Sequence, residues 1–166
     1  VDLGWVVRQV LSDLEARIEA SGATVEVGDL PIVMGDASQL RQVLQNLIAN
    51  ALKFRMVGRA PRVQVDGRAA APVAGRAGRW CVISVRDNGL GFPPEYASAI
   101  FAPFKRLHGR SEFEGTGIGL AIVRRVVEHH HGKVSARGEP EVGAEFQLEL
   151  PCLGAGQHAA IEASGR

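Results

Sequence analysis

The chain has 166 residues, 46% of them hydrophobic, and a formal net charge of +1. This size and composition predict one compact domain with its own core, and the balanced charge argues against binding to nucleic acid or a membrane surface. Cys81 and Cys152 have no motif spacing, which favours reduced thiols in a cytoplasmic protein. No apolar run is long enough to span a bilayer, and we expect no signal peptide. Because the chain opens directly on an amphipathic pattern, we expect it to be part of a longer protein.

The first half of the chain predicts two helices separated by short strands. Hydrophobic residues recur at helical spacing from residue 3 to residue 18, and Ser21 and Gly22 end this helix. Strand-like runs follow at 24–27 and 32–34. Asp36 is expected to cap a second helix that reaches about Phe54.

The second half is richer in strands. Runs at 62–65 and 80–87 predict two strands joined by an exposed connector at 67–78. A short helix from Pro93, a helix beginning near Gly117 and strands at 133–136 and 144–150 complete a domain at 1–151, with a flexible tail at 152–166. About three helices and five strands predict an α+β fold. We expect a two-layer α/β sandwich, whose mixed, mostly antiparallel sheet packs on the helices.

The second predicted helix has two chemically different sides. One side is apolar and is formed by Leu40, Val43, Leu44, Leu47, Ile48 and Ala51. Asn46, Asn50 and Lys53 fall on a separate narrow stripe. Such a stripe is either a solvated polar face or one wall of a cleft, where an amide oxygen could join phosphate oxygens around Mg²⁺.

Asp87 ends an apolar strand and is followed by Asn88, Gly89, Leu90 and Gly91. A carboxylate fixed there could accept a hydrogen bond from the exocyclic amine of adenine, and a pocket built for that donor rejects guanine. The two glycines would allow the backbone to approach the base. The alternative is an ordinary Asp-Asn-Gly turn.

A glycine-rich segment precedes the last predicted helix. It consists of Gly115, Thr116, Gly117, Ile118, Gly119 and Leu120. Free backbone N–H groups at a helix start can bind phosphates, although a glycine-rich loop that simply caps a core helix fits as well. The segment is neither a P-loop nor a dinucleotide fingerprint.

Residues 105–114 are polar and predict a mobile lid anchored in the core by Phe101 and Phe104. When the lid closes, Lys105, Arg106, His108 or Arg110 could reach phosphates.

The order of these motifs resembles the ATP-binding catalytic domain of sensor histidine kinases, with its Bergerat-type ATP fold, over residues 1–151. The resemblance implies binding of ATP with Mg²⁺ and donation of the γ-phosphoryl group to a histidine on a separate dimerisation domain. Asn50 would be the metal ligand, and Asn46 and Lys53 the catalytic phosphate contacts. The nucleotide would be bound by Asp87, Gly89, Gly91, Lys105, Arg106, Gly115, Thr116, Gly117, Ile118, Gly119 and Leu120.

The resemblance also implies partners. The acceptor domain would precede this domain in a homodimeric parent protein, and a response regulator would follow in the signalling pathway. None of the five histidines has the acceptor context of a histidine followed by an acidic residue, so we expect no autophosphorylation by this chain, which should be monomeric alone. Stretches at 50–55, 61–65, 104–110 and 114–121 look like the phytochrome-class branch, whose parent would be a bacterial photoreceptor.

Two positions depart from related patterns. ATPases and serine kinases of the same fold commonly carry a Glu where this chain has Asn46. An amide is a poor base, which favours transfer to histidine over hydrolysis. The last family motif usually ends in Ser or Thr, whereas Ala144 lacks that hydroxyl. The alternatives are a catalytically silent nucleotide-binding or partner-docking module and, third, a hydrolase.

Overall fold

The computed structural model of the chain describes residues 1–103 and 118–153. Its helices are α1 (Leu3–Asp13), α2 (Glu15–Ser21), α3 (Ala37–Lys53) and α4 (Gly119–His129), with short 3₁₀ helices η1 (Pro94–Tyr96) and η2 (Ala99–Phe101). Its strands are β1 (Thr24–Val27), β2 (Arg62–Ala69), β3 (Arg79–Asp87), β4 (Lys133–Glu139) and β5 (Gly143–Cys152). No helix in this described part combines the length and the apolarity needed to cross a membrane.

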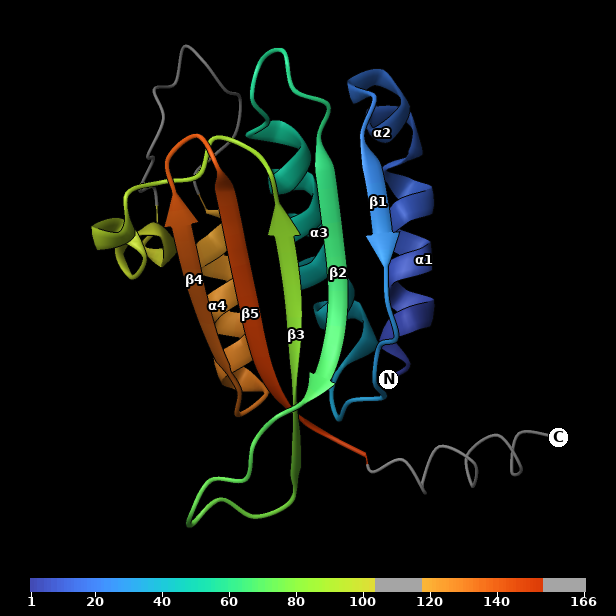
Figure 1. Ribbon diagram of the computed structural model, residues 1–166. Coiled ribbons are helices and arrows are strands. Elements are labelled where there is room, and N and C mark those ends of the chain that lie inside the picture. The colour runs from blue at the N-terminus through green and yellow to red at the C-terminus, as the bar shows by residue number, and fades with distance from the viewer. Residues whose placement is uncertain (104–117, 154–166) are drawn as a thin grey trace, which may run out of the picture.

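The strands form one sheet in the order β1-β2-β3-β5-β4. β1 and β2 are parallel, and the other three pairs are antiparallel. Helices α1, α3 and α4 lie together behind one face of this sheet (Figure 1). The predicted two-layer α+β sandwich with a mixed, mostly antiparallel sheet is therefore confirmed.

The core lies between the sheet and helices α1, α3 and α4. Alternate residues of β2 and β3, including Val63, Val65 and Ile83, are buried because successive side chains of a strand point to opposite faces. All six apolar residues predicted for the inner side of α3 are buried as well. Asp36 caps α3 as predicted, since its Oδ1 accepts a hydrogen bond from the Gln39 N–H at 2.9 Å.

Several predicted boundaries were wrong. The first helix is divided at Leu14 (φ −97°, ψ 6°), although the Ile18 N–H still donates to the Leu14 carbonyl oxygen. β2 continues to Ala69, well into the predicted connector, because pairing with β3 extends to Cys81. The run at 32–34 makes only isolated bridges, from Ile32 to Asp2 and from Val33 to Cys152. β5 spans Gly143–Cys152 and is therefore longer than the predicted strand at 144–150, and residues 154–166 lie outside the described part.

Candidate nucleotide site

Asp87 is the last residue of β3, and its carboxyl group is held by main-chain donors from two segments. Its Oδ1 accepts from the Gly89 N–H at 2.8 Å and from the Ala144 N–H, at the start of β5, at 3.3 Å. Oδ2 has no hydrogen-bond partner among the described residues. The carboxyl group is therefore fixed through one oxygen, and the other remains available to a ligand donor.

The surroundings of Asp87 make its charged form costly. Burial raises the pKa of this carboxyl from 3.8 to about 6, and the hydrogen bonds from Gly89 and Ala144 oppose that change. A buried carboxyl group with an unusual pKa is characteristic of a functional position. At neutral pH the group is mostly ionised and can accept a hydrogen bond from an amine.

The glycines after Asp87 are required by close approach of neighbouring backbone. A β-carbon on Gly89 would collide with the carbonyl oxygen of Phe54, just after α3. Gly91 has a φ of +62°, and a β-carbon there would collide with the carbonyl oxygens of Glu139 and Gly143 in the β4–β5 turn. The turn after Asp87 is thus packed between α3 and the β4–β5 turn.

The predicted stripe on α3 is half-buried at all three positions, Asn46, Asn50 and Lys53. Lys53 Nζ lies 5.0 Å from the centroid of the Phe54 ring. The C-terminal end of α3 also meets the Asp87 turn directly, since the Leu90 N–H donates to the Phe54 carbonyl oxygen at 2.8 Å. The C-terminal end of the helix that carries the stripe therefore lies next to the Asp87 turn.

The start of α4 meets the N-terminal end of this stripe, at Asn46. A β-carbon built on Gly119 would stand 3.4 Å from Asn46 Oδ1. Ile118 precedes the helix and accepts a hydrogen bond from the Ile122 N–H at 3.0 Å, while Leu120 is half-buried in the first turn. Figure 1 shows the last residues of β3, the C-terminal end of α3 and the start of α4 at one end of the molecule.

Several predicted site residues cannot be placed. Lys105, Arg106, Gly115, Thr116 and Gly117 lie outside the described residues, together with the predicted lid at 105–114 and Phe104. Phe101 is buried as predicted and packs edge-on against Phe146, with ring centroids 6.1 Å apart.

Sequence reasoning missed some groups that build the site. The Phe54 carbonyl oxygen and the Ala144 N–H are main-chain atoms, so no side-chain pattern could reveal them. Asn88 was read only as part of a turn, but its side chain accepts from the Arg62 N–H at 2.8 Å and donates to the Ala60 carbonyl oxygen at 3.1 Å. The Asp-Asn-Gly sequence was a usable signal for that role.

Known proteins resemble this chain over most of its length. The profile of the family described as histidine kinase-, DNA gyrase B-, and HSP90-like ATPase matches residues 35–153. Phytochrome-like protein Cph1 of Synechocystis sp. is 41% identical over 150 residues, which cover 90% of this chain and 19% of that protein. The adaptive-response sensory kinase SasA of Prochlorococcus marinus is 35% identical over 155 residues, covering 91% of this chain and 40% of SasA. The chain thus spans less than half the length of these relatives.

Solved structures show the same fold. The mycobacterial sensor histidine kinase MprB matches with a TM-score of 0.75 and 29% identity, covering 92% of this chain and 95% of that one. A full-length structure of ShkA in complex with AMPPNP matches with a TM-score of 0.73 and 33% identity, covering 93% of this chain and 31% of that one. The predicted likeness to phytochrome-class kinases is confirmed by the match to Cph1. The chain belongs to the family of histidine kinase-, DNA gyrase B- and HSP90-like ATPases, as a catalytic domain of the sensor histidine kinase type.

Proposed function

We propose that this domain binds ATP with Mg²⁺ at the Asp87 end of the molecule. In this proposal it donates the γ-phosphoryl group to a histidine on a separate dimerisation domain of a two-component signalling protein. The observation that carries the proposal is the Asp87 carboxyl group, which is held through Oδ1 and offers Oδ2 to a ligand. That arrangement suits the exocyclic amine of adenine, because an ionised carboxylate only accepts hydrogen bonds.

In this proposal the remaining residues are assigned to parts of the nucleotide that suit their chemistry. Gly89 and Gly91 leave room beside the base, and the N–H groups at the start of α4, from Gly119 and Leu120, suit phosphates. In the proposal Ile118 and the undescribed Gly115, Thr116, Gly117, Lys105 and Arg106 complete the phosphate contacts. Lys53 supplies a cation for the transferred group.

Asn50 is the residue that would hold Mg²⁺. Its amide is half-buried on α3, one turn after the Asn46 side chain that meets the start of α4. A hard cation that keeps several waters needs few protein oxygens, so one amide oxygen beside phosphates fits it. The ion would neutralise phosphate charge when bound.

Asn46 favours phosphoryl transfer over hydrolysis. Its side chain lies against the start of α4, where a carboxylate could have served as a base. An amide cannot deprotonate water near neutral pH. A histidine acceptor already carries a lone pair on nitrogen, so the N–P bond can form as the bond from the γ-phosphorus to the bridging oxygen breaks, and ADP leaves with that electron pair.

Relatives support the whole-protein part of the proposal. The names of Cph1 and SasA describe a phytochrome-like protein and a sensory kinase, and ShkA was solved with AMPPNP. We therefore propose that the parent protein of this chain is a cytoplasmic homodimer with a red-light sensory region. A response regulator would be its downstream partner.

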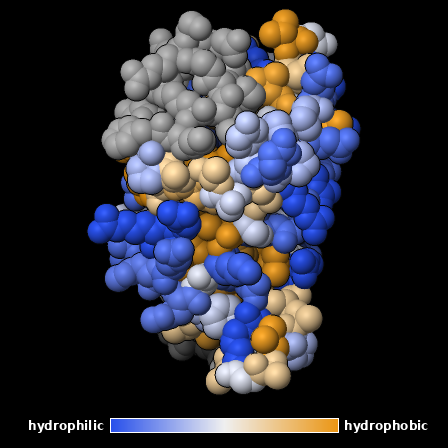
Figure 2. Space-filling model, turned by 90° about the vertical axis from the view of Figure 1, so that its left-hand side faces the viewer, coloured by the Kyte–Doolittle hydropathy of each residue, from blue (hydrophilic) through white to orange (hydrophobic). Residues whose placement is uncertain are grey.

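A silent partner-docking module is the second candidate. It would be favoured by a broad hydrophobic surface away from the nucleotide site. Over its described part, the face seen from the β4 side has mostly hydrophilic side chains with hydrophobic areas between them (Figure 2). The polarity of that face gives docking no particular support, and the site geometry favours nucleotide binding.

Calorimetric titration tests the first step. ATP with Mg²⁺ should bind the purified chain, and GTP should bind much more weakly. Transfer is tested by adding a histidine-containing dimerisation domain of a sensor kinase as the acceptor in trans, with its acceptor histidine changed to alanine as the control. Acid-labile phosphate on the intact acceptor supports the proposal. Binding of ATP without transfer favours the silent module, and steady release of phosphate by the chain alone favours a hydrolase.

A further inference from the structure

We infer that Arg59 is a positioning residue for the purine, acting by clamping the Asp87 turn to the β4–β5 turn. The inference rests on the proposed function, because it takes Asp87 as the group that reads the base. Arg59 lies in the loop between α3 and β2, outside every motif that the sequence singles out.

The guanidinium group of Arg59 donates to two main-chain carbonyl groups at once. Nη1 donates to the Asn88 oxygen at 2.8 Å, and Nη2 donates to the Glu141 oxygen at 2.9 Å. Asn88 follows Asp87 directly, and Glu141 lies in the turn that leads into Ala144. The planar fork of an arginine can span two such acceptors, whereas a lysine ammonium carries its three donors on a single nitrogen and lacks this fixed geometry.

The donors that hold the Asp87 carboxyl group lie in or directly after the two clamped segments. Gly89 lies in one segment, and Ala144 is the second residue of β5, the strand that follows the other. The segments also bond to each other, since the Glu141 N–H donates to the Leu90 carbonyl oxygen at 2.8 Å. Holding these segments together fixes where Oδ2 of Asp87 stands.

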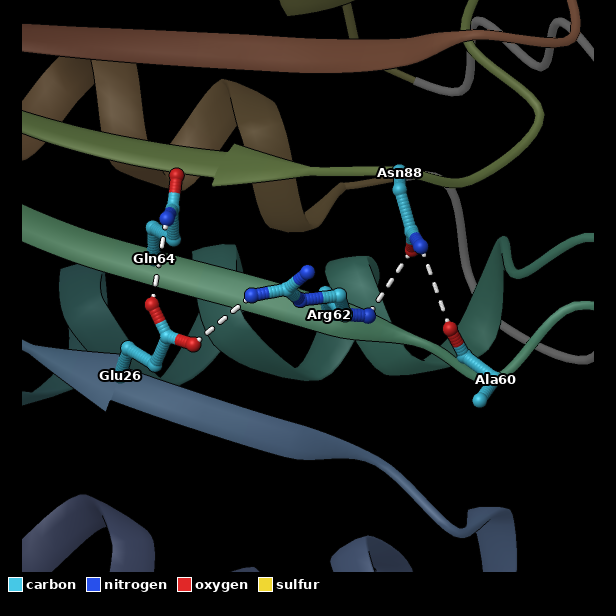
Figure 3. Close-up of polar contacts among 5 residues, drawn as sticks. All are labelled: Glu26, Ala60, Arg62, Gln64 and Asn88. Atoms are coloured by element: carbon cyan, nitrogen blue, oxygen red, sulfur yellow. Dashed lines mark hydrogen bonds and ion pairs between the residues drawn. The ribbon is translucent and has the colours of Figure 1, made fainter.

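The loop that carries Arg59 also bonds to the side chain of Asn88. The Asn88 side chain bonds to the Ala60 oxygen and the Arg62 N–H, as Figure 3 shows. Arg62 in turn pairs with Glu26 on the exposed face of the sheet at 2.9 Å. Residues 59–62 therefore bind Asn88 through its main-chain oxygen and through both ends of its side-chain amide.

The backbone of Glu141 indicates that this turn needs external support. Its φ is +64°, a left-handed conformation that is unfavourable for a residue with a β-carbon. A strained conformation persists when its surroundings fix it. Arg59 supplies one of those restraints, and the bond to Leu90 supplies another.

The Arg59 clamp links the end of α3, which carries Lys53, to the Asp87 turn. The loop that carries Arg59 leaves α3 immediately after Lys53 and Phe54, and the guanidinium reaches across to the base side. Arg59 is itself exposed, so its removal leaves the core intact. Its loss should loosen the position of Asp87 without unfolding the domain.

The test compares Arg59→Ala, Arg59→Lys and a matched control, Arg68→Ala. Arg68 is an exposed arginine at the other end of β2, with no side-chain hydrogen bond to any described residue. Calorimetry measures binding of Mg-ATP, Mg-GTP and magnesium tripolyphosphate, which lacks a base. Thermal unfolding monitors the fold of each variant.

Arg59→Ala should weaken ATP binding roughly tenfold, as expected for charge-assisted bonds near the surface. It should also reduce the preference for ATP over GTP, while tripolyphosphate binding changes less than twofold. Arg59→Lys should recover only part of the ATP affinity, and Arg68→Ala should bind like the unaltered protein.

Three results would overturn the clamp. Equal losses for ATP and tripolyphosphate would show that Arg59 acts only as a positive charge, as would full recovery by Arg59→Lys. Unchanged ATP affinity and base preference in Arg59→Ala would show that the clamp has no role in binding. Failure of the unaltered protein to bind ATP is a different outcome, since it rejects the proposed nucleotide site itself.

Discussion

Gly119, at the start of α4, faces the side chain of Asn46 on α3, and a β-carbon on this glycine would stand 3.4 Å from Asn46 Oδ1. The two helices therefore meet where one offers main-chain N–H groups and the other offers an amide. If phosphate binds at this helix start, as we propose, a methyl group placed there would occupy part of the space that the phosphate needs.

Gly119→Ala should consequently weaken ATP binding several-fold while the fold is retained, because alanine suits a helix better than glycine. Calorimetry and thermal unfolding measure the two effects. Gly132→Ala is the contrasting variant, since its β-carbon would collide with the Glu149 carbonyl oxygen and should destabilise the whole domain. Unaltered ATP affinity in a folded Gly119→Ala variant would show that the phosphates do not bind at this helix start.

Asp87→Asn should separate nucleotide binding from stability. An asparagine Oδ1 can still accept from Gly89 and Ala144, and the burial cost of the charge disappears, so the melting temperature at pH 7 should stay the same or rise. ATP binding should fall by at least about 100-fold, because an amide N–H₂ would face the adenine amine. Calorimetry with ATP and GTP measures this, and unchanged ATP affinity in the folded variant would reject the assignment of the base.

The pKa of Asp87 predicts how binding depends on pH. Since burial raises this pKa to about 6, the carboxyl group takes up a proton as pH falls below that value and loses its strength as an acceptor. ATP affinity should therefore decrease between pH 7 and pH 5. The same titrations should be repeated with the Asp87→Asn variant. Its remaining affinity for ATP should not show the decrease that comes from protonation of Asp87.

The same pKa predicts the pH dependence of stability. The folded carboxyl group has the higher pKa, so its contribution to stability is fully present below the unfolded value near 3.8 and is lost as pH rises to about 6. The stability gained on changing Asp87 to Asn should therefore grow from pH 4 to pH 6. Urea unfolding at several pH values measures the difference, and a constant difference would contradict the raised pKa.

Asn50→Ala should remove the dependence of ATP binding on magnesium. In the unaltered protein, affinity should rise when Mg²⁺ is added to ATP, because Asn50 is the proposed ligand. In the variant, titrations with and without Mg²⁺ should converge. If Mg²⁺ raises the ATP affinity of the variant as much as that of the unaltered protein, another residue binds the metal.

His131→Gly should stabilise the domain. His131 has a φ of +63°, its N–H donates to the Glu128 oxygen, and the Gly132 N–H donates to the Val127 oxygen. These bonds form a Schellman motif whose left-handed position usually carries glycine. The substitution should add about 1 kcal/mol to the free energy of unfolding. His129→Gly is the control and should be destabilising, because His129 still belongs to the helix.

Local patterns in the sequence determined the elements and much of the site. The apolar side of α3, the Asp36 cap and the alternation of β3 follow from residue spacing, which fixes the face that each side chain occupies. The motif order was also sufficient to identify the family. Boundaries that depend on a partner strand were less accurate, because the extent of β2 is set by its pairing with β3.

Only the tertiary structure decided which groups meet. It placed Gly119 against Asn46, bonded the Asp87 turn to the end of α3, and brought Arg59 to carbonyl groups that lie 29 and 82 residues away in the chain. Such contacts involve main-chain atoms that every residue possesses. No residue pattern distinguishes the carbonyl groups that will be bonded, because chain packing brings donor and acceptor within reach.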